Sequence, residues 1–317
     1  MTKNTTTWRP RVATAVVMTV FILFWYKIAS WLPPKNSNSD SKHLNGSSSS
    51  VMISVPIETV MSGEPVQLGQ DDSRVSKFIW DHGYLQPASK LGYNLTSGDK
   101  DPSMGQGQMI RKIFKNMTGG FFVECGGLDG ETRSNTLFLE KELGWKGLLV
   151  EADPKNYALL MQKQRKAWAS NSCLATKPYP HKVVFQQDFN TGRIKDDSSK
   201  LVPKRKKKME ETLVQCFPIY SLLSALSVTT VDYFSLDVEG AEMEVLATIP
   251  FDKVFIKTLS VEFNHVGVGK DALRKVMEDK GYVIVGQVKH SRNWANDFIF
   301  VHNSLHQLIA AAAEEEQ

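Results

Sequence analysis

The 317-residue sequence predicts an α/β protein with a doubly wound, mostly parallel sheet that closes in an antiparallel hairpin. From about residue 105, helix patterns alternate with short apolar strand patterns, which is typical of parallel sheets covered by helices on both faces. Three of the strand patterns, in residues 121–130, 144–154 and 231–240, end in an acid, and in the first and third a glycine follows closely. Carboxyl ends of such strands bind nucleotide-like ligands, and glycine there lets backbone and ligand approach closely.

The length and pattern of the apolar segments predict the helices and strands of the first half of the domain. A run of about five apolar residues between turn residues suits a buried strand, and a longer periodic segment suits a helix. The expected elements are, in order, helix 106–115, strand 120–124, helix 136–143, strand 147–151, helix 156–169 and strand 183–187.

The second half begins after a long exposed loop expected over residues 190–210. Gly192, Pro203 and a basic run from Lys204 to Lys208 disfavour regular structure there. Helix 241–247 is expected to turn Glu242 and Glu244 outward. The expected elements after the loop are strand 214–217, helix 219–226, strand 233–237, helix 241–247, strand 254–262, helix 270–280 and a hairpin of 282–288 with 297–301.

Glu151 ends the second strand about two dozen residues after the glycine turn. An acid at this spacing can accept hydrogen bonds from both ribose hydroxyls of a nucleoside cofactor. The turn itself, with Gly126, Gly127 and Gly130, misses the Gly-x-Gly-x-x-Gly register of dinucleotide-binding proteins. Spacing alone leaves the kind of nucleoside cofactor open.

These blocks, together with Glu242 and residues 296–301, resemble the FkbM family of S-adenosylmethionine-dependent methyltransferases. The resemblance covers roughly residues 100–302. It implies S-adenosylmethionine as the cofactor and a class I methyltransferase (Rossmann-like) sheet that ends in an antiparallel hairpin. Leu128 departs from the pattern, because many relatives in the wider superfamily have glycine there.

The cofactor site is expected at the ends of the first three strands. Glu124 is expected to fix the methionine amino group, with a cap for the following turn as the alternative. Asp188 follows the third expected strand, where the superfamily often meets adenine. Asp153, followed by Pro154, is expected to cap a helix instead. The expected cofactor-binding residues are Glu124, Gly126, Gly127, Asp129, Gly130, Glu151 and Asp188.

Asp237 ends the fourth strand over the expected position of the transferable methyl group. Methyl transfer needs an oxygen or nitrogen nucleophile freed of its proton, which a carboxylate, a histidine or a metal can assist. The expected catalytic residues are Asp237, Glu239, Glu262 and His265. Asp237, Glu262 and Asn264 also offer oxygen ligands for a hard cation such as Mg²⁺ or Ca²⁺, but no metal ligand is assigned.

The N-terminal region predicts a membrane anchor. Residues 12–32 are almost wholly apolar, and at about 1.5 Å per residue they can cross a hydrocarbon core of about 30 Å. Lys3, Arg9 and Arg11 precede them, which places a tail of residues 1–11 in the cytosol. A cleaved signal peptide is the alternative. A flexible luminal stem over 33–70 and a domain over 71–317 are expected to follow.

Cysteine content and charge limit the other classes of function. Cys125 is expected to be a buried thiol, whereas Cys173 and Cys216 flank the third expected strand and could pair in an oxidising lumen. Spacing leaves that pairing open. A net charge of +4 is too small to indicate a nucleic-acid partner.

Two functions are expected from the resemblance. The nearest likeness is to Star-like proteins, which join such a domain to one membrane span. This implies transport of a membrane-tethered growth-factor precursor from the endoplasmic reticulum to the Golgi. The expected location is the membrane of these two compartments, with endosome or plasma membrane as further sites. The C-terminal domain is expected to be luminal or extracellular. The alternative is an active S-adenosylmethionine-dependent O-methyltransferase that acts on a luminal hydroxyl.

Overall fold

The computed structural model describes residues 68–195, 209–265, 269–290 and 295–314, which belong to one structural unit. The predicted tail 1–11, membrane span 12–32 and nearly all of the predicted stem lie outside these residues, as does the basic run 204–208. Among the helices that the structure describes, none is long and apolar enough to span a bilayer.

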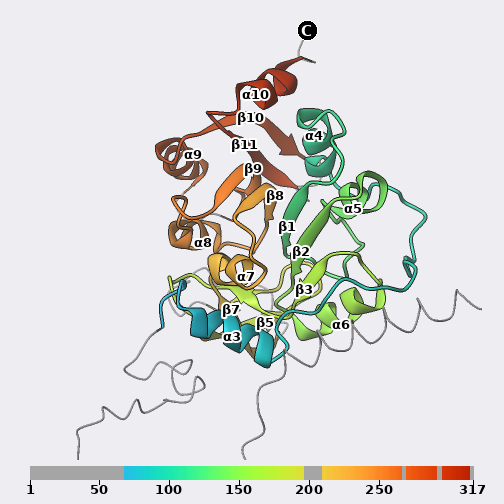
Figure 1. Cartoon of the computed structure of the whole chain (residues 1–317), viewed down its shortest axis with the longest axis vertical. Helices are drawn as coiled ribbons and strands as arrows, with labels where there is room; N and C mark the ends of the chain where they lie inside the picture. The colour runs from blue at the N-terminus through green and yellow to red at the C-terminus, as the bar shows by residue number, and fades with distance from the viewer. Residues whose placement is uncertain (1–67, 196–208, 266–268, 291–294, 315–317) are drawn as a thin grey trace, which may run out of the picture. The chain divides into compact units, whose positions relative to one another are not determined.

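A seven-stranded sheet with the order β10-β11-β9-β8-β1-β2-β3 forms the centre of the fold (Figure 1). Its strands are β1 (Phe121–Cys125), β2 (Lys146–Val150), β3 (Trp168–Ser170), β8 (Thr230–Leu236), β9 (Phe255–Glu262), β10 (Tyr282–Lys289) and β11 (Asn296–His302). β1 pairs in parallel with β2 and β8, whereas β11 runs antiparallel to β9 and β10. The predicted doubly wound sheet with a closing hairpin is confirmed.

Helices cover both faces of this sheet, because its central strands are apolar on both sides. In β1, Phe122 packs into one layer and Val123 into the other. One layer contains α3 (Ser73–Asp81), α7 (Ile219–Ala225), α8 (Glu242–Thr248) and α9 (Lys270–Asp279). The other contains α4 (Gln106–Ile113), α5 (Leu137–Leu143), α6 (Pro154–Gln162) and α10 (His306–Ala313).

Helix α6 begins as predicted and ends earlier than predicted. Asp153 accepts the backbone N–H of Lys155 at 2.8 Å, and Pro154 occupies the first turn, which confirms the cap. The expected helix over 156–169 is wrong beyond residue 162. The chain turns there because Lys163 and Arg165 point inward to buried carboxylates, and residues 168–170 then pair with β2 as the third strand of the sheet.

A second sheet with the order β4-β7-β5-β6 was not predicted. Its strands are β4 (Cys173–Leu174), β5 (His181–Gln187), β6 (Arg193–Ile194) and β7 (Glu210–Phe217). The strand expected at 183–187 therefore belongs to this sheet and not to the central one. Its residues alternate between exposed and partly buried, as in a strand with one solvated face, and it pairs antiparallel with β7.

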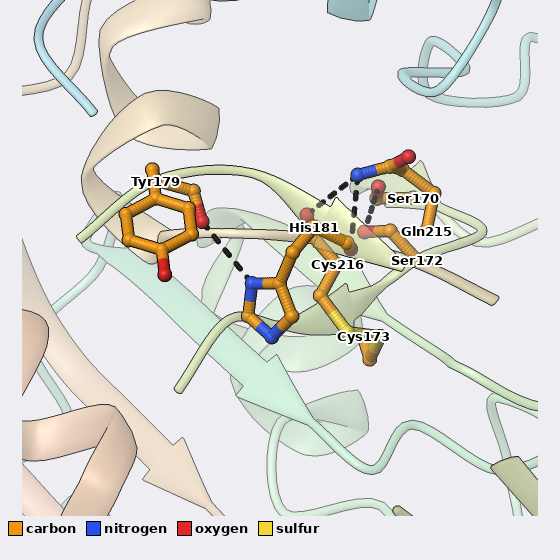
Figure 2. Close-up of a disulfide and its surroundings, with 7 residues drawn as sticks. All are labelled: Ser170, Ser172, Cys173, Tyr179, His181, Gln215 and Cys216. Atoms are coloured by element: carbon orange, nitrogen blue, oxygen red, sulfur yellow. Dashed lines mark hydrogen bonds between the residues drawn. A yellow bond between two sulfur atoms is a disulfide. The ribbon is translucent and has the colours of Figure 1, made fainter. Parts of the chain in front are cut away.

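A disulfide between Cys173 and Cys216 joins β4 to β7 at a position where the two strands are in register (Figure 2). Beside it, the Gln215 side chain donates to the carbonyl oxygens of His181 and Cys216 at 3.1 and 2.9 Å. Cys125 is buried and unpaired. The pairing that the sequence left open is thus present.

Candidate active site

A cavity of about 310 Å³ lies at the carboxyl ends of β1, β2, β8 and β9. The strand order reverses between β1 and β8, and open α/β sheets bind their ligands at such a point. The second sheet contributes a wall through Cys173, Leu174 and Phe185. The cavity is of a size usual for small-molecule sites.

The glycine turn after β1 brings two strand ends together. Gly126 has φ of 81°, and a Cβ atom there would collide with the carbonyl oxygen of Asp237. Glycine is therefore required where β1 passes the end of β8. Gly127 and Gly130 lie against Leu160 of α6 and are not among the residues that line the cavity, so their expected contact with cofactor stays a prediction.

The Glu124 carboxylate lines the cavity, but both of its oxygens already accept hydrogen bonds from other residues of the chain. They accept hydrogen bonds from Ser134 Oγ, the Asn135 backbone N–H and Thr136 Oγ1 at 2.9, 2.6 and 2.5 Å. Burial raises the pKa of Glu124 in spite of these bonds. These bonds are those of a cap for the following turn, which the sequence left open as the alternative. The expected contact with a methionine amino group stays a prediction.

Asp129 is not among the residues that line the cavity, and its expected contact with cofactor stays a prediction. Its Oδ1 accepts the backbone N–H groups of Glu131 and Thr132 at 3.0 and 2.7 Å. A short polar side chain in a turn commonly bonds to backbone two or three residues on, and here that bond directs the carboxylate away from the strand ends.

Glu151 ends β2 inside the cavity, as the sequence predicts. Its two oxygens accept the backbone N–H groups of Leu128 and Asp153 at 2.8 and 2.7 Å. Burial raises its pKa to about 8. A carboxylate has about four lone-pair sites, so both oxygens can still accept a ligand hydroxyl. Leu128 has φ of 46°, a left-handed conformation that favours glycine and explains why glycine is frequent at this turn position.

Asp188 lines the cavity, although it does not follow the third strand of the central sheet. It follows β5 of the second sheet and accepts the Phe189 backbone N–H and the Thr191 hydroxyl, each at 2.9 Å. Asn156 of α6 donates to the Phe189 carbonyl at 3.0 Å and fastens this loop to the helix. Sequence reasoning missed Phe189, which lines the cavity and is 41% exposed, because it lies beyond any strand pattern.

The four predicted catalytic residues come together at the ends of β8 and β9. Nδ1 of His265 lies 3.0 Å from Oε2 of Glu239 and 3.0 Å from Oε2 of Glu262. Hydrogen bonds to these carboxylates, Glu239 first, raise the pKa of His265 to about 10. Asp237 lines the cavity beside them, and its buried Oδ1 has no hydrogen-bond partner among the described residues. Burial and the nearby Glu262 raise the pKa of Asp237 well above its usual value.

Two further acids enter this cluster that the sequence did not assign to it. Glu242, expected to point outward, is fully buried and accepts the backbone N–H groups of Val238 and Gly240 at 3.0 and 3.1 Å. It turns inward because it satisfies the turn that precedes α8. Asp297 of β11 accepts Gln106 Nε2 at 2.8 Å. Burial raises the pKa of each to about 7.

Glu242 follows Gly240 by two residues, and an acid at this spacing can accept the backbone N–H of a glycine turn. This signal in the sequence could have placed Glu242 correctly. Asp297 gives no such signal, because its place in the cluster depends on the pairing of β11 with β9. Asn264, offered by the sequence as a cation ligand, is exposed.

A doubly wound sheet with a carboxylate-lined cavity at its switch point is typical of α/β proteins that bind nucleotide-like ligands. Residues 124–284, just over half of the chain, match the methyltransferase FkbM domain, and the chain belongs to this family. The family implies use of S-adenosylmethionine, and the sheet is of the class I methyltransferase type.

Several solved structures share distant similarity with this chain. The METTL16 MTase domain has 9% identity and a TM-score of 0.38, covering 73% of this chain and 80% of its own. A TehB-like SAM-dependent methyltransferase from Corynebacterium glutamicum has 12% identity and a TM-score of 0.34, with coverage of 73% and 100%. The human methyltransferase 10 domain containing protein has 11% identity and a TM-score of 0.35, with coverage of 72% and 93%. Among curated proteins, none matches this chain.

Proposed function

We propose that this chain transfers a methyl group from S-adenosylmethionine to a hydroxyl oxygen of an acceptor. The observation that carries the proposal is Glu151, a buried carboxylate that ends β2 inside the switch-point cavity of an FkbM-family domain. Its position matches that of an acid which binds the two ribose hydroxyls of a nucleoside. The expected transport role has no described residue in its favour and stays a prediction.

The residues around the cavity fit such a cofactor. The Gly126 backbone faces the cavity without a side chain, so a ligand can approach it closely. Phe185, Phe189 and Ile194 offer apolar surface for a flat base. Asp237 lines the cavity after the end of β8 and has an unpartnered carboxylate oxygen, which we assign to the proposed reacting end.

When bound, S-adenosylmethionine would supply a methyl group on a positively charged sulfur. Its transfer would form a carbon–oxygen bond to the acceptor and break the carbon–sulfur bond, whose electron pair would stay on sulfur. The hydroxyl proton must pass to a base. His265, with a pKa of about 10, holds its own proton at neutral pH and so orients its two carboxylate partners. We assign proton acceptance to Glu239, which lines the cavity and whose side chain is 19% exposed.

Methyl transfer with isotopically labelled S-adenosylmethionine tests the proposal. The full chain is incubated with glycan and small-molecule extracts, and labelled products are identified by mass spectrometry. We expect labelled methyl ethers, and Glu239→Gln should lower their rate by about 10²-fold or more, the scale of a lost general base. Glu244→Gln, an exposed acid on α8, is the control that should leave the rate unchanged.

Label on nitrogen or carbon would contradict transfer to oxygen. Retained cofactor binding with no labelled product in any extract would contradict the catalytic role and leave transport of cargo as the better account.

A further inference from the structure

We propose that Asp237, Glu242 and Glu262 bind a divalent cation of the hard, oxygen-preferring class that includes Mg²⁺, Mn²⁺ and Ca²⁺. One carboxylate oxygen from each residue lies within 4.8 Å of the others. Such ions bind oxygen at about 2.0–2.6 Å, so two ligands on opposite sides of an ion are separated by about this distance.

The backbone holds these three ligands in place. Asp237 directly follows β8, Glu262 is the last residue of β9, and these strands are parallel neighbours. Glu242 opens α8, and its carboxylate is fixed by the amides of Val238 and Gly240. A ligand set built on two strand ends and a helix start is therefore preorganised, which favours binding.

The unpartnered oxygen of Asp237 is a second observation that indicates a ligand. Oδ1 is shielded from solvent, and no described residue donates a hydrogen bond to it. Buried polar side-chain atoms are nearly always paired, so an exception at the centre of an acidic cluster requires explanation. A cation would supply the missing partner.

The charges around the cluster also favour a cation. Glu239 and Asp297 act electrostatically on Asp237 in addition to Glu242 and Glu262. Nδ1 of His265 lies 3.0 Å from Glu239 and from Glu262, and the His265 side chain is 45% exposed. The ion pairs of His265 are with Glu239 and Glu262, and not with Asp237 or Glu242. Because all three proposed ligands are carboxylates, a hard ion suits them better than a thiophilic one.

A cation here would face the reacting end of the cavity, since Asp237 and Glu262 line it. Bound to an acceptor hydroxyl, it would lower the pKa of that hydroxyl and orient its oxygen. Cation binding goes beyond the proposed use of S-adenosylmethionine, because it can be measured with no cofactor present.

Mn²⁺ titration followed by electron paramagnetic resonance tests the site. The full chain, purified in mild detergent and treated with EDTA, is titrated with Mn²⁺ alone, and the signal of the free ion is recorded. We expect one bound Mn²⁺ per chain, displaced by millimolar Mg²⁺ or Ca²⁺. Glu262→Gln and Glu242→Gln should each weaken binding at least about tenfold. Glu244→Gln lies two residues along the same helix, is exposed, and should bind like the unmodified chain.

Glu242 also holds the turn before α8, so thermal unfolding in EDTA checks that each variant folds. If Glu242→Gln does not fold, Glu262→Gln decides alone. Absence of Mn²⁺ binding at millimolar concentration, or equal binding in all variants, would overturn the proposal. Titration with S-adenosylhomocysteine in EDTA reports on the cofactor separately, so either proposal can fail without the other.

Discussion

At the scale of single residues, the approach of β1 to the end of β8 depends on Gly126. A side chain there would meet the Asp237 carbonyl, and the backbone is also left-handed, with φ of 81°. Gly144, at the end of α5, has a left-handed φ of 65° but nothing within 4 Å of an added Cβ. Substitutions at these two glycines can therefore distinguish the cost of backbone strain alone from the added cost of a steric clash.

We expect Gly144→Ala to lower the free energy of unfolding by about 1 kcal/mol, the cost of a left-handed conformation alone. Gly126→Ala should cost at least about 1 kcal/mol more, because strand ends must also move apart. Urea unfolding of both variants measures the difference. Equal losses of unfolding free energy in the two variants would show that the Asp237 carbonyl can move away from the added Cβ without destabilising the protein.

The residues that the sequence placed correctly are those at the ends of apolar strands. Glu151 and Asp237 could be assigned because a parallel strand delivers its last side chains to one edge of the sheet. Asp129 could not, because it lies in a turn, where the side chain points to whichever backbone amide it can bond. Glu242 was misplaced because the helical pattern alone was considered, and its bonds back to the preceding glycine turn were not. The direction of Asp129 depends on turn geometry that a residue pattern does not specify.

At the scale of elements, the second sheet forms one wall of the cavity and is fastened by the disulfide between β4 and β7 (Figure 2). Replacing both Cys173 and Cys216 by serine should lower the free energy of unfolding by about 2–4 kcal/mol, because the unfolded chain loses a constraint. Cofactor affinity should fall as well, since Cys173 lines the cavity.

Urea unfolding with and without reductant measures this effect. Reductant should destabilise the unmodified chain and leave the serine variant unchanged. Equal sensitivity of the two proteins, or free thiols at both positions in peptide maps, would contradict the contribution of the disulfide.

A buried ion pair fixes the segment between α6 and β3. Nε of Arg165 lies 3.1 Å from both carboxylate oxygens of Glu140, and both side chains are almost fully buried. Arg165→Met would leave Glu140 buried without its partner, which should cost about 3–5 kcal/mol.

The exposed pair between Lys155 and Glu210 is a suitable control. Lys155→Met should cost less than about 1 kcal/mol, because water screens that pair. Thermal or urea unfolding compares the two variants. Similar losses of unfolding free energy in the two variants would show that burial of the ion pair does not increase the contribution of Arg165 to stability.

This ion pair also explains why the third strand was misplaced. Residues 156–169 read as one helical segment, since Lys163 and Arg165 look like ordinary surface residues of a helix. Their charges find buried partners only in the folded protein, and this tertiary contact ends the helix at residue 162. Segments fixed by local patterns, such as β1, β2, β8 and the closing hairpin, were predictable.

At the scale of the whole molecule, the buried acids make the stability of the cation-free protein depend on pH. Burial raises the pKa of Glu151 to about 8 and those of Glu242 and Asp297 to about 7, above the unfolded values of about 4. Between these limits the native state holds protons that the unfolded chain has released, so stability falls as pH rises. The pKa of His265, raised to about 10, acts in the same direction from about pH 6.5 upward.

We therefore expect the melting temperature in EDTA to be highest near pH 5 and to fall by several degrees towards pH 9. Differential scanning fluorimetry measures it, and Glu242→Gln should flatten the slope because one titrating acid is removed. A melting temperature that stays constant or rises over this range would contradict the buried acids.

Cofactor binding tests the central claim most directly. Isothermal titration calorimetry of the full chain with S-adenosylhomocysteine should give saturable binding at one site. Glu151→Ala should weaken it by about 1–3 kcal/mol, the scale of two lost hydrogen bonds, while Glu142→Ala, an exposed acid on α5, should bind normally. The absence of both heat and any rise in melting temperature at millimolar ligand, in protein that folds, would contradict the account.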